Sequence, residues 1–191
     1  MVNNWKLPIK TDWMKSQMNH EPTRVYAEEI YQCIKNNKSD YKNALEIGAA
    51  WGVSSLSILL AGDGKLTSVD INPKVKTPKE INANNFEDRH EFINSSSEEF
   101  YKKNDETFDI VYVDGGHTYE LAHLDIRECW KILNPGGLMI VDDVVHKYNK
   151  EVHPEALEPH FGVAIAVMEH IVNNNITKIG SSPKLWWTAK E

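Results

Sequence analysis

Cysteine, long apolar runs and positive charge are all scarce in this sequence of 191 residues. The two cysteines, Cys33 and Cys129, lie far apart in helix-like stretches and form no Cys-x-x-Cys pair, so we expect buried thiols. The longest apolar runs are short, such as Leu138–Val141, against the roughly 20 residues that a membrane-spanning helix needs. The sequence therefore predicts neither a disulfide framework nor a membrane protein.

Basic residues are outnumbered, because 21 Lys and Arg stand against 28 Asp and Glu and give a formal charge of −7. Such a surface repels phosphate backbones, and the chain has no basic run of five or more residues. We therefore expect no nucleic-acid partner. The N-terminus has no apolar core or small-residue cleavage site of the kind found in a signal peptide, which favours a cytoplasmic location.

What is present is the composition of an ordinary globular protein, with 41% hydrophobic and 26% charged residues. The length favours a single domain over residues 1–191. A domain of this length can bury about 70% of its unfolded-chain surface and needs no disulfides or structural metal ions to fold. Residues 1–20 are polar with isolated large side chains, and we expect an N-terminal arm there. Residues 144–159 form a polar stretch that we expect to be an active-site loop.

Strand and helix patterns alternate along most of the chain. The strands are mostly continuous apolar runs, which is typical of parallel strands covered by helices on both faces. They are expected at Ala44–Ile47, Leu66–Val69, Glu91–Ile93, Ile110–Val113 and Leu138–Val141, with two more at Ile176–Gly180 and Lys184–Thr188. No helix separates the last two strands, so we expect them to be antiparallel. The pattern predicts an α/β three-layer, Rossmann-like sandwich around a mostly parallel seven-stranded sheet that ends in an antiparallel hairpin.

In such a sheet, ligands bind beyond the carboxyl ends of the strands. The first strand runs into Glu46-Ile-Gly-Ala-Ala-Trp-Gly-Val-Ser54, where two glycines allow a tight turn and the following helix offers free N–H groups. The second strand ends in Asp70, which can accept hydrogen bonds from a ribose. These features predict a site for a nucleoside-containing ligand, although the glycines would also suit a simple turn.

The spacing of this turn separates two kinds of nucleoside ligand. A nicotinamide enzyme would show Gly-x-Gly-x-x-Gly, whereas position 50 is Ala and the glycines here are Gly48 and Gly52. Glu46, two positions before the first glycine, suits the cationic methionine part of S-adenosylmethionine better than a pyrophosphate. The turn therefore favours S-adenosylmethionine.

Four segments resemble the class I S-adenosylmethionine-dependent methyltransferases, and more narrowly the metal-dependent O-methyltransferases of the catechol and macrocin type. They are Glu46–Ser54, Ser68–Ile71, Asp109–Glu120 and Leu133–Asp143, and their order and spacing fit from about Tyr41 to the end. The general class has glycine where this chain has Ala50, and the metal-dependent branch commonly lacks that glycine. The resemblance implies that Glu46 and the backbone around Gly48, Ala49 and Gly52 hold the methionine moiety, Ser54 its carboxylate, Asp70 the ribose and Ser96 the adenine.

Strands four and five end in Asp114 and in Asp142-Asp143, which should be neighbours across the cofactor crevice. Three converging carboxylates would repel one another unless a cation lies between them, and oxygen ligands suit Mg²⁺ or Mn²⁺. Any one of them could instead be a helix cap or a solvated acid. Together with the resemblance, they predict a divalent metal site formed by Asp114, Asp142 and Asp143.

Proton transfer needs a basic group beside the acceptor. His117, just past strand four, or Asp114 itself would receive the proton, although His117 could equally pack beside the cofactor. His146, His153 and His160 are expected to be exposed loop residues, with a metal or substrate contact as the alternative.

The resulting hypothesis is a divalent-metal-assisted O-methyltransferase that uses S-adenosylmethionine on a hydroxyl of a small molecule or sugar. A metal-independent methyltransferase with another acceptor and a cofactor-binding module without catalysis remain alternatives. A nucleic-acid amino-methyltransferase is disfavoured, because Asp114-Gly-Gly-His117 replaces the Asp/Asn-Pro-Pro-aromatic run typical of those enzymes. Large aromatics near the termini suggest a homodimer. They are Trp5, Trp13, Trp186 and Trp187, and we expect the last two to pack on opposite faces of the sheet.

Overall fold

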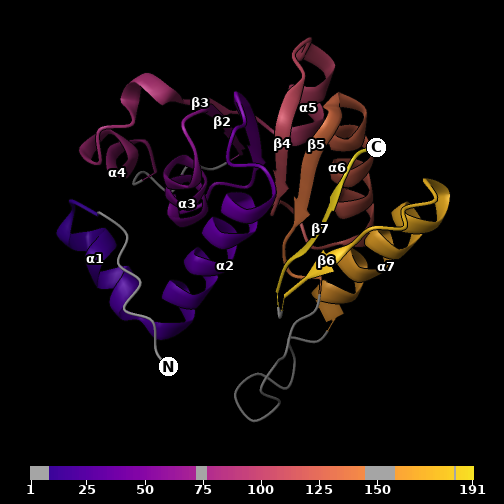
Figure 1. Cartoon of the computed structure of the whole chain (residues 1–191), viewed down its shortest axis with the longest axis horizontal. Coiled ribbons are helices and arrows are strands. Elements are labelled where there is room, and N and C mark those ends of the chain that lie inside the picture. The colour runs from indigo at the N-terminus through magenta and orange to yellow at the C-terminus, as the bar shows by residue number, and fades with distance from the viewer. Residues whose placement is uncertain (1–8, 72–76, 145–157, 183) are drawn as a thin grey trace.

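The computed structural model describes residues 9–71, 77–144, 158–182 and 184–191. Its centre is a seven-stranded sheet in the order β3-β2-β1-β4-β5-β7-β6 (Figure 1). The first five strands pair in parallel, and β7 is antiparallel to both β5 and β6, which confirms the predicted sheet. The strands are β1 Asn43–Ile47, β2 Lys65–Asp70, β3 His90–Asn94, β4 Phe108–Val113, β5 Leu133–Val141, β6 Gly180–Ser181 and β7 Trp186–Ala189.

Helices cover both faces of the sheet, as Figure 1 shows. Helices α1 to α4 contribute to the hydrophobic core on one face, and α5 to α7 contribute to the core on the other. Two layers of helices thus enclose the sheet and leave the carboxyl ends of its strands for a site. The helices are α1 Asp12–Asn19, α2 Glu21–Asn37, α3 Val53–Ala61, α4 Thr77–Ala83, the 3₁₀-helix η1 Glu87–Arg89, α5 Ser97–Lys103, α6 Tyr119–Ile132 and α7 Glu158–Asn173.

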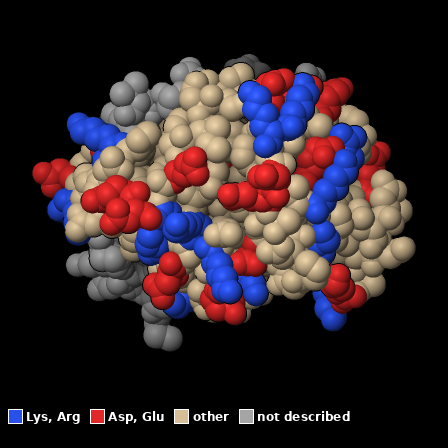
Figure 2. All heavy atoms as spheres, turned by 90° about the horizontal axis from the view of Figure 1, so that it is seen from above, with Lys and Arg blue, Asp and Glu red and all other residues tan. Residues whose placement is uncertain are grey.

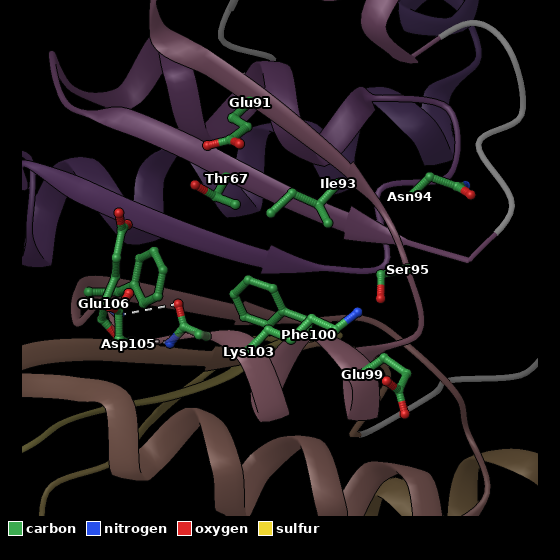
Figure 3. Close-up of a pocket in the computed structure, with 12 residues that line it drawn as sticks. Thr67, Glu91, Ile93, Asn94, Ser95, Glu99, Phe100, Lys103, Asp105 and Glu106 are labelled. Carbon is green, nitrogen blue, oxygen red and sulfur yellow. Dashed lines mark hydrogen bonds between the residues drawn. The ribbon is translucent and has the colours of Figure 1, made fainter.

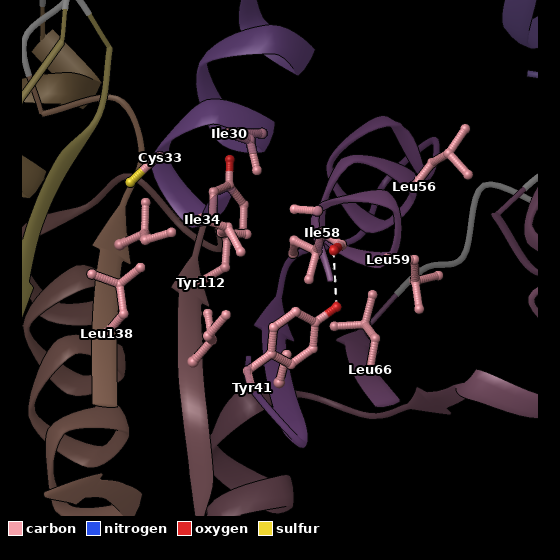
Figure 4. Packing of buried hydrophobic residues seen from close by; sticks show 14 of the residues in the cluster. Ile30, Cys33, Ile34, Tyr41, Leu56, Ile58, Leu59, Leu66, Tyr112 and Leu138 are labelled. Atoms are coloured by element: carbon pink, nitrogen blue, oxygen red, sulfur yellow. Dashed lines mark hydrogen bonds between the residues drawn. The ribbon is translucent and has the colours of Figure 1, made fainter. Parts of the chain in front are cut away.

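The core on the α2 and α3 face packs aliphatic side chains around Tyr41, whose hydroxyl donates to the carbonyl oxygen of Ile58 at 2.9 Å (Figure 4). Cys33 belongs to this core and Cys129 to the opposite one, and both are buried free thiols as predicted. The last strand contributes to both cores, with Trp186 in the second and Trp187 packed against the first. The two indoles therefore point to opposite faces, as expected.

Part of the expected N-terminal arm forms a helix. Thr11 caps α1 by accepting a hydrogen bond from the backbone N–H of Met14 at 3.2 Å, and Met14 is fully buried. Two helical turns with one fully buried residue give too short an apolar pattern to reveal a helix in the sequence. The expected arm is therefore a structured element on the α2 face.

The last hairpin is shorter than expected. The strand expected at Ile176–Gly180 is replaced by the two-residue strand β6, Gly180–Ser181, and the carbonyl of Lys178 before it accepts a hydrogen bond from the side-chain hydroxyl of Thr188 at 2.6 Å. Strand β5 is longer than expected and begins at Leu133, with a register shift against β4 between Phe108 and Ile110. Most of the expected 144–159 loop lies outside the described residues.

Charges of both signs are interspersed on the face in Figure 2, which carries no continuous basic patch among its described residues. In the described part of the chain, no helix combines the length and apolar character needed to cross a membrane.

Candidate active site

The turn after β1 is fixed by its backbone. Gly48 and Gly52 have φ angles of +90° and +81°, in the left-handed region that favours glycine. A Cβ atom on Gly48 would lie 1.9 Å from the carbonyl oxygen of Asp114, so only glycine lets the end of β1 meet the end of β4 this closely. Ala50 also has a positive φ, and its carbonyl accepts a hydrogen bond from the hydroxyl of Thr77 at 2.5 Å.

Asp70, at the end of β2, faces this turn. Its Oδ2 atom accepts hydrogen bonds from the backbone N–H groups of Ala49 at 3.0 Å and Ala50 at 2.9 Å. The carboxylate is thereby oriented at the mouth of a cavity of about 410 Å³. The cavity lies across the carboxyl ends of β1, β2 and β4 and is lined by Gly48, Ala50, Asp70, Ser95, Ser96, Ser97, Asp114, Gly115, Gly116, Leu121 and Asp125, among others.

Two of the predicted cofactor residues, Ser96 and Ser54, lie at the starts of helices that border the cavities. Ser96 caps α5 by accepting a hydrogen bond from the N–H of Glu99 at 3.2 Å, and it lines this cavity. Ser54, in the first turn of α3, is buried and lines a second cavity described below. Ser54 therefore lies on the side of the second cavity, and its contact with a ligand carboxylate stays a prediction.

Glu46 is the penultimate residue of β1, and its contact with the cofactor stays a prediction. Its side chain is fully buried, lines neither cavity, and accepts hydrogen bonds at Oε2 from Ser55 at 2.6 Å and Ser68 at 2.5 Å. Burial raises the pKa of this carboxyl, and the serine hydroxyls, with Ser54 first, partly counteract the rise. The structure thus places Glu46 as a support beneath the glycine turn, in contact with β2 and α3.

An acidic centre lies at the ends of β4 and β5. The Nε2 atom of His117 is 3.4 Å from Asp143 Oδ2 and 3.8 Å from Asp114 Oδ1. One ligand atom from each of these three residues lies within 4.8 Å of the others, which suits a single cation. Asp143 has a φ of +55°, a strained conformation for a residue with a Cβ that turns its carboxylate into the cluster.

Asp142 belongs to the same centre but uses its oxygens differently. Its Oδ1 accepts the backbone N–H of Asp143 at 2.7 Å, and its Oδ2 accepts the hydroxyl of Tyr112 at 3.1 Å. Asp142 is therefore not part of the three-residue cluster, and His117 stands where the sequence predicted a third carboxylate. The side chain of Asp142 is almost completely buried and orients its neighbours.

Two residues of the centre, Tyr26 and Lys184, were not predicted from the sequence. Tyr26 of α2 lies 2.6 Å from the Tyr112 hydroxyl and donates to Asp114 Oδ2 at 3.0 Å. Lys184, immediately before β7, places its Nζ atom 3.1 Å from Asp143 Oδ1. These residues come from segments far from strands four and five in the sequence, and no motif or spacing pointed to them.

The charges of the centre influence one another. Burial and then the carboxylates of Asp142 and Asp143 raise the pKa of Asp114, while His117 counteracts part of that rise. The Asp114 carboxylate in turn raises the pKa of His117, against the effect of burial. The pKa values of Asp114 and His117, the two residues predicted to handle the proton of an acceptor, are therefore coupled through their charges.

A second cavity, of about 440 Å³, opens beside the acidic centre. Its apolar wall contains Trp51, which is 42% exposed and packs against Trp13 with ring centroids 5.8 Å apart. The two cavities share Ala50 and Asp114 in their walls, so they meet at the end of the glycine turn. The second cavity is lined by Gln17, Pro22, Thr23, Tyr26, Ala49, Ala50, Trp51, Val53, Ser54, Asp114, Asp142, Asp143 and Lys184.

Another cavity, of about 390 Å³, lies between β2, β3 and α5 (Figure 3). Its labelled side chains include Glu91, Glu99 and Lys103, and it shares only Ser95 with the cavity at Asp70. It contains neither the glycine turn nor the acidic centre, so it is separate from the site. The histidines expected in the loop, His146, His153 and His160, lie outside the described side chains.

The sheet order, the antiparallel end and the glycine turn together define a Rossmann-like methyltransferase fold. Residues 45–144, just over half of the chain, match the model of a family described as methyltransferase domain, and the chain belongs to that family. No curated protein matches the chain in sequence.

Solved structures share this fold at low sequence identity. An O-methyltransferase from Bacillus cereus in complex with S-adenosylhomocysteine (SAH) is 15% identical, with a TM-score of 0.71 over 97% of this chain and 93% of that one. The SAH-bound methyltransferase PaMTH1 of Podospora anserina is 16% identical, with a TM-score of 0.71 over 94% and 84%. The O-methyltransferase TomG of Streptomyces achromogenes, in complex with S-adenosylmethionine (SAM), is 16% identical, with a TM-score of 0.67 over 97% and 93%.

Proposed function

We propose that this chain is a SAM-dependent O-methyltransferase that acts on a hydroxyl group of a small molecule or sugar, assisted by a divalent metal ion. The observation that carries this proposal is the meeting of two cavities at Asp114 and Ala50. One cavity contains Asp70 and the glycine turn, and the other contains the acidic centre. The methyl group of SAM at the boundary of the first cavity would face an acceptor oxygen held in the second cavity.

The cofactor assignment is supported by the first cavity. Asp70 is oriented by two backbone N–H groups and can accept hydrogen bonds from ribose hydroxyls, and Ser96 lies at the same cavity. The similar structures from Bacillus cereus, Podospora anserina and Streptomyces achromogenes hold SAH or SAM. SAM carries an activated methyl group, so this chain has to supply positioning and proton removal.

The metal assignment is supported by the donor atoms of Asp114, His117 and Asp143. Two carboxylates and one imidazole within 4.8 Å of one another suit Mn²⁺ better than Mg²⁺, which prefers oxygen ligands alone. A divalent ion bound there would lower the pKa of an acceptor hydroxyl. Asp114 would then take the hydroxyl proton at a carboxylate oxygen that the ion does not bind, and His117 would take it only if its acceptor nitrogen does not bind the ion. The apolar wall at Trp51 would exclude water around the acceptor.

The proposal is tested first by cofactor binding. SAH should raise the melting temperature of the protein by mass action, whereas NAD should leave it unchanged. Asp70→Ala should weaken SAH binding at least tenfold in calorimetry, because it removes the ribose acceptor. Stabilisation by NAD and not by SAH would contradict the proposal.

Methyl transfer to a panel of hydroxylated acceptors, with and without chelator, separates the alternatives. We expect activity that disappears with chelator and returns with Mn²⁺. Full activity in excess chelator would instead identify a metal-independent methyltransferase, an alternative favoured by the positive charge that Lys184 already brings to Asp143. Tight SAH binding without transfer to any acceptor would leave a cofactor-binding module.

A further inference from the structure

Lys184 is held against the acidic centre by its backbone and its side chain. The backbone N–H of Val144, the residue after Asp143, donates to the carbonyl of Lys184 at 3.3 Å, so the loop before β7 lies beside the end of β5. Its Nζ atom is 3.1 Å from Asp143 Oδ1 and 3.5 Å from Asp142 Oδ2. The ammonium also lies over the ring of Tyr26, 4.4 Å from its centroid.

These contacts differ from those of an ordinary surface ion pair. The side chain of Lys184 is only 31% exposed, and those of Asp142 and Asp143 are 1% and 11% exposed. Charges that are shielded from water interact more strongly than exposed pairs, which contribute little.

Asp143 joins Lys184 to the candidate metal ligands. Its Oδ1 faces Lys184, while its Oδ2 faces His117, which belongs to the three-residue cluster with Asp114. A divalent ion in that cluster would share Asp143 with the ammonium, or would displace it. In both cases the positive charge of Lys184 opposes the incoming ion, and in the absence of the ion it offsets the repulsion between the carboxylates.

We propose that Lys184 is a built-in counter-cation of the acidic centre, which keeps the metal-free site assembled and sets its affinity for a divalent ion. This inference rests on the proposed function, because it concerns the same site. It makes Lys184 a positioning residue that acts through Asp143. Removing its charge should therefore strengthen metal binding while it weakens the metal-free protein, a combination that a purely structural ion pair would not produce.

The test compares variants of the full chain by Mn²⁺ titration calorimetry and by melting temperature in chelator. Lys184→Met should bind Mn²⁺ at least tenfold more tightly than the parent chain and should melt at a lower temperature in chelator. Lys184→Gln, which is neutral but can still donate to Asp143, tests the same charge if the Met variant does not fold. Lys184→Arg should restore the parent affinity.

The matched control is Lys178→Met, which removes the same charge from an exposed pair with Glu191 and should leave Mn²⁺ affinity unchanged. Unchanged or weaker Mn²⁺ binding by Lys184→Met and Lys184→Gln would overturn the inference. SAH binding in metal-free buffer keeps the two proposals apart. If SAH fails to bind the parent chain, the proposed function fails. If SAH binds and Mn²⁺ affinity does not rise in the variants, only the role of Lys184 fails.

Discussion

At the residue scale, Gly48 is the tightest constraint on the site. Its position requires both a left-handed backbone and an empty space beside the carbonyl of Asp114. We expect Gly48→Ala to destabilise the protein by about 3 kcal/mol or more and to abolish SAH binding, because the ends of β1 and β4 must separate. Chemical denaturation and calorimetry measure the two effects.

Gly136 provides the control for this substitution. It also has a positive φ, of +73°, but a Cβ atom there would have no neighbour within 4 Å. Gly136→Ala should therefore lower the free energy of unfolding by only about 1 kcal/mol, which is the cost of a left-handed backbone at alanine, and SAH should still bind. Equal losses in the two variants would show that the contact with Asp114 is unimportant.

The two neighbouring carboxylates at the end of β5 should differ in metal binding. Asp143 belongs to the three-residue cluster, whereas both oxygens of Asp142 accept hydrogen bonds from protein groups. Asp143→Asn should weaken Mn²⁺ binding more than tenfold, and Asp142→Asn should weaken it less. Calorimetry with Mn²⁺ decides between this order and the equal roles that the sequence predicts for the two residues.

The sequence predicted the carboxylates better than their partners. Asp70, Asp114 and Asp143 lie at or within two residues of the ends of buried strands, where the rule that ligands bind at strand ends predicted site residues. Tyr26 and Lys184 reach the same centre from α2 and from the loop before β7, and only the three-dimensional packing brings them there. The burial of Glu46 could not be predicted from the sequence motif either, because a motif does not show which way a side chain points.

At the element scale, the contact between α6 and α7 contains a buried histidine. His170 packs edge-on against Trp130, with ring centroids 4.8 Å apart, and its Nε2 atom has no hydrogen-bond partner in the described structure. Burial lowers its pKa to about 4. In the unfolded chain, this histidine binds a proton near pH 6.5. The free energy of unfolding is therefore unaffected by the histidine above pH 6.5 and decreases as the pH falls from 6.5 to 4.

We therefore expect His170→Phe to reduce the acid sensitivity of the fold. At pH 5 the neutral histidine costs the folded state about 2 kcal/mol relative to pH 8, and phenylalanine removes this proton linkage. The free energy of unfolding, measured by urea denaturation at both pH values, should change less with pH in the variant. A pH dependence identical to that of the parent chain would contradict this origin.

The regular elements were largely predictable, because their apolar patterns are long. Helix α6 repeats its apolar side chains over several turns, and β4 is a continuous buried run. Helix α1 is only 8 residues long, and β6 has 2. Elements this short contain too few apolar positions for a pattern, and individual hydrogen bonds such as the Thr11 cap of α1 are only visible in the structure.

At the scale of the whole molecule, we propose that the chain forms a homodimer through the outer face of α7. Of the tryptophans near the termini, Trp186 is buried, and Trp13 packs on Trp51. The outer face of α7 is instead apolar and exposed. It contains Phe161, Ile165, Met168 and Val172, which are 48–73% exposed at heptad-like spacing.

Sedimentation velocity tests this assembly. The parent chain should sediment as a species of about twice its mass of 21.9 kDa, and a double variant with Ile165→Glu and Met168→Glu should sediment as a monomer. Val25→Glu, on an exposed position of α2, is the control and should remain dimeric. A monomeric parent chain at micromolar concentration would rule the dimer out.

The pair formed by Trp13 and Trp51 has a practical consequence for finding the acceptor. Trp51 lines the cavity at the acidic centre and is partly open to solvent, so its fluorescence emission should respond when a molecule enters. Such a signal reports occupancy before any bond is made, and it does so even for compounds that are bound but never methylated. A library could thus be screened optically, with Trp51→Phe as the reference, and the chemistry of the responders would then test whether the site selects hydroxylated molecules.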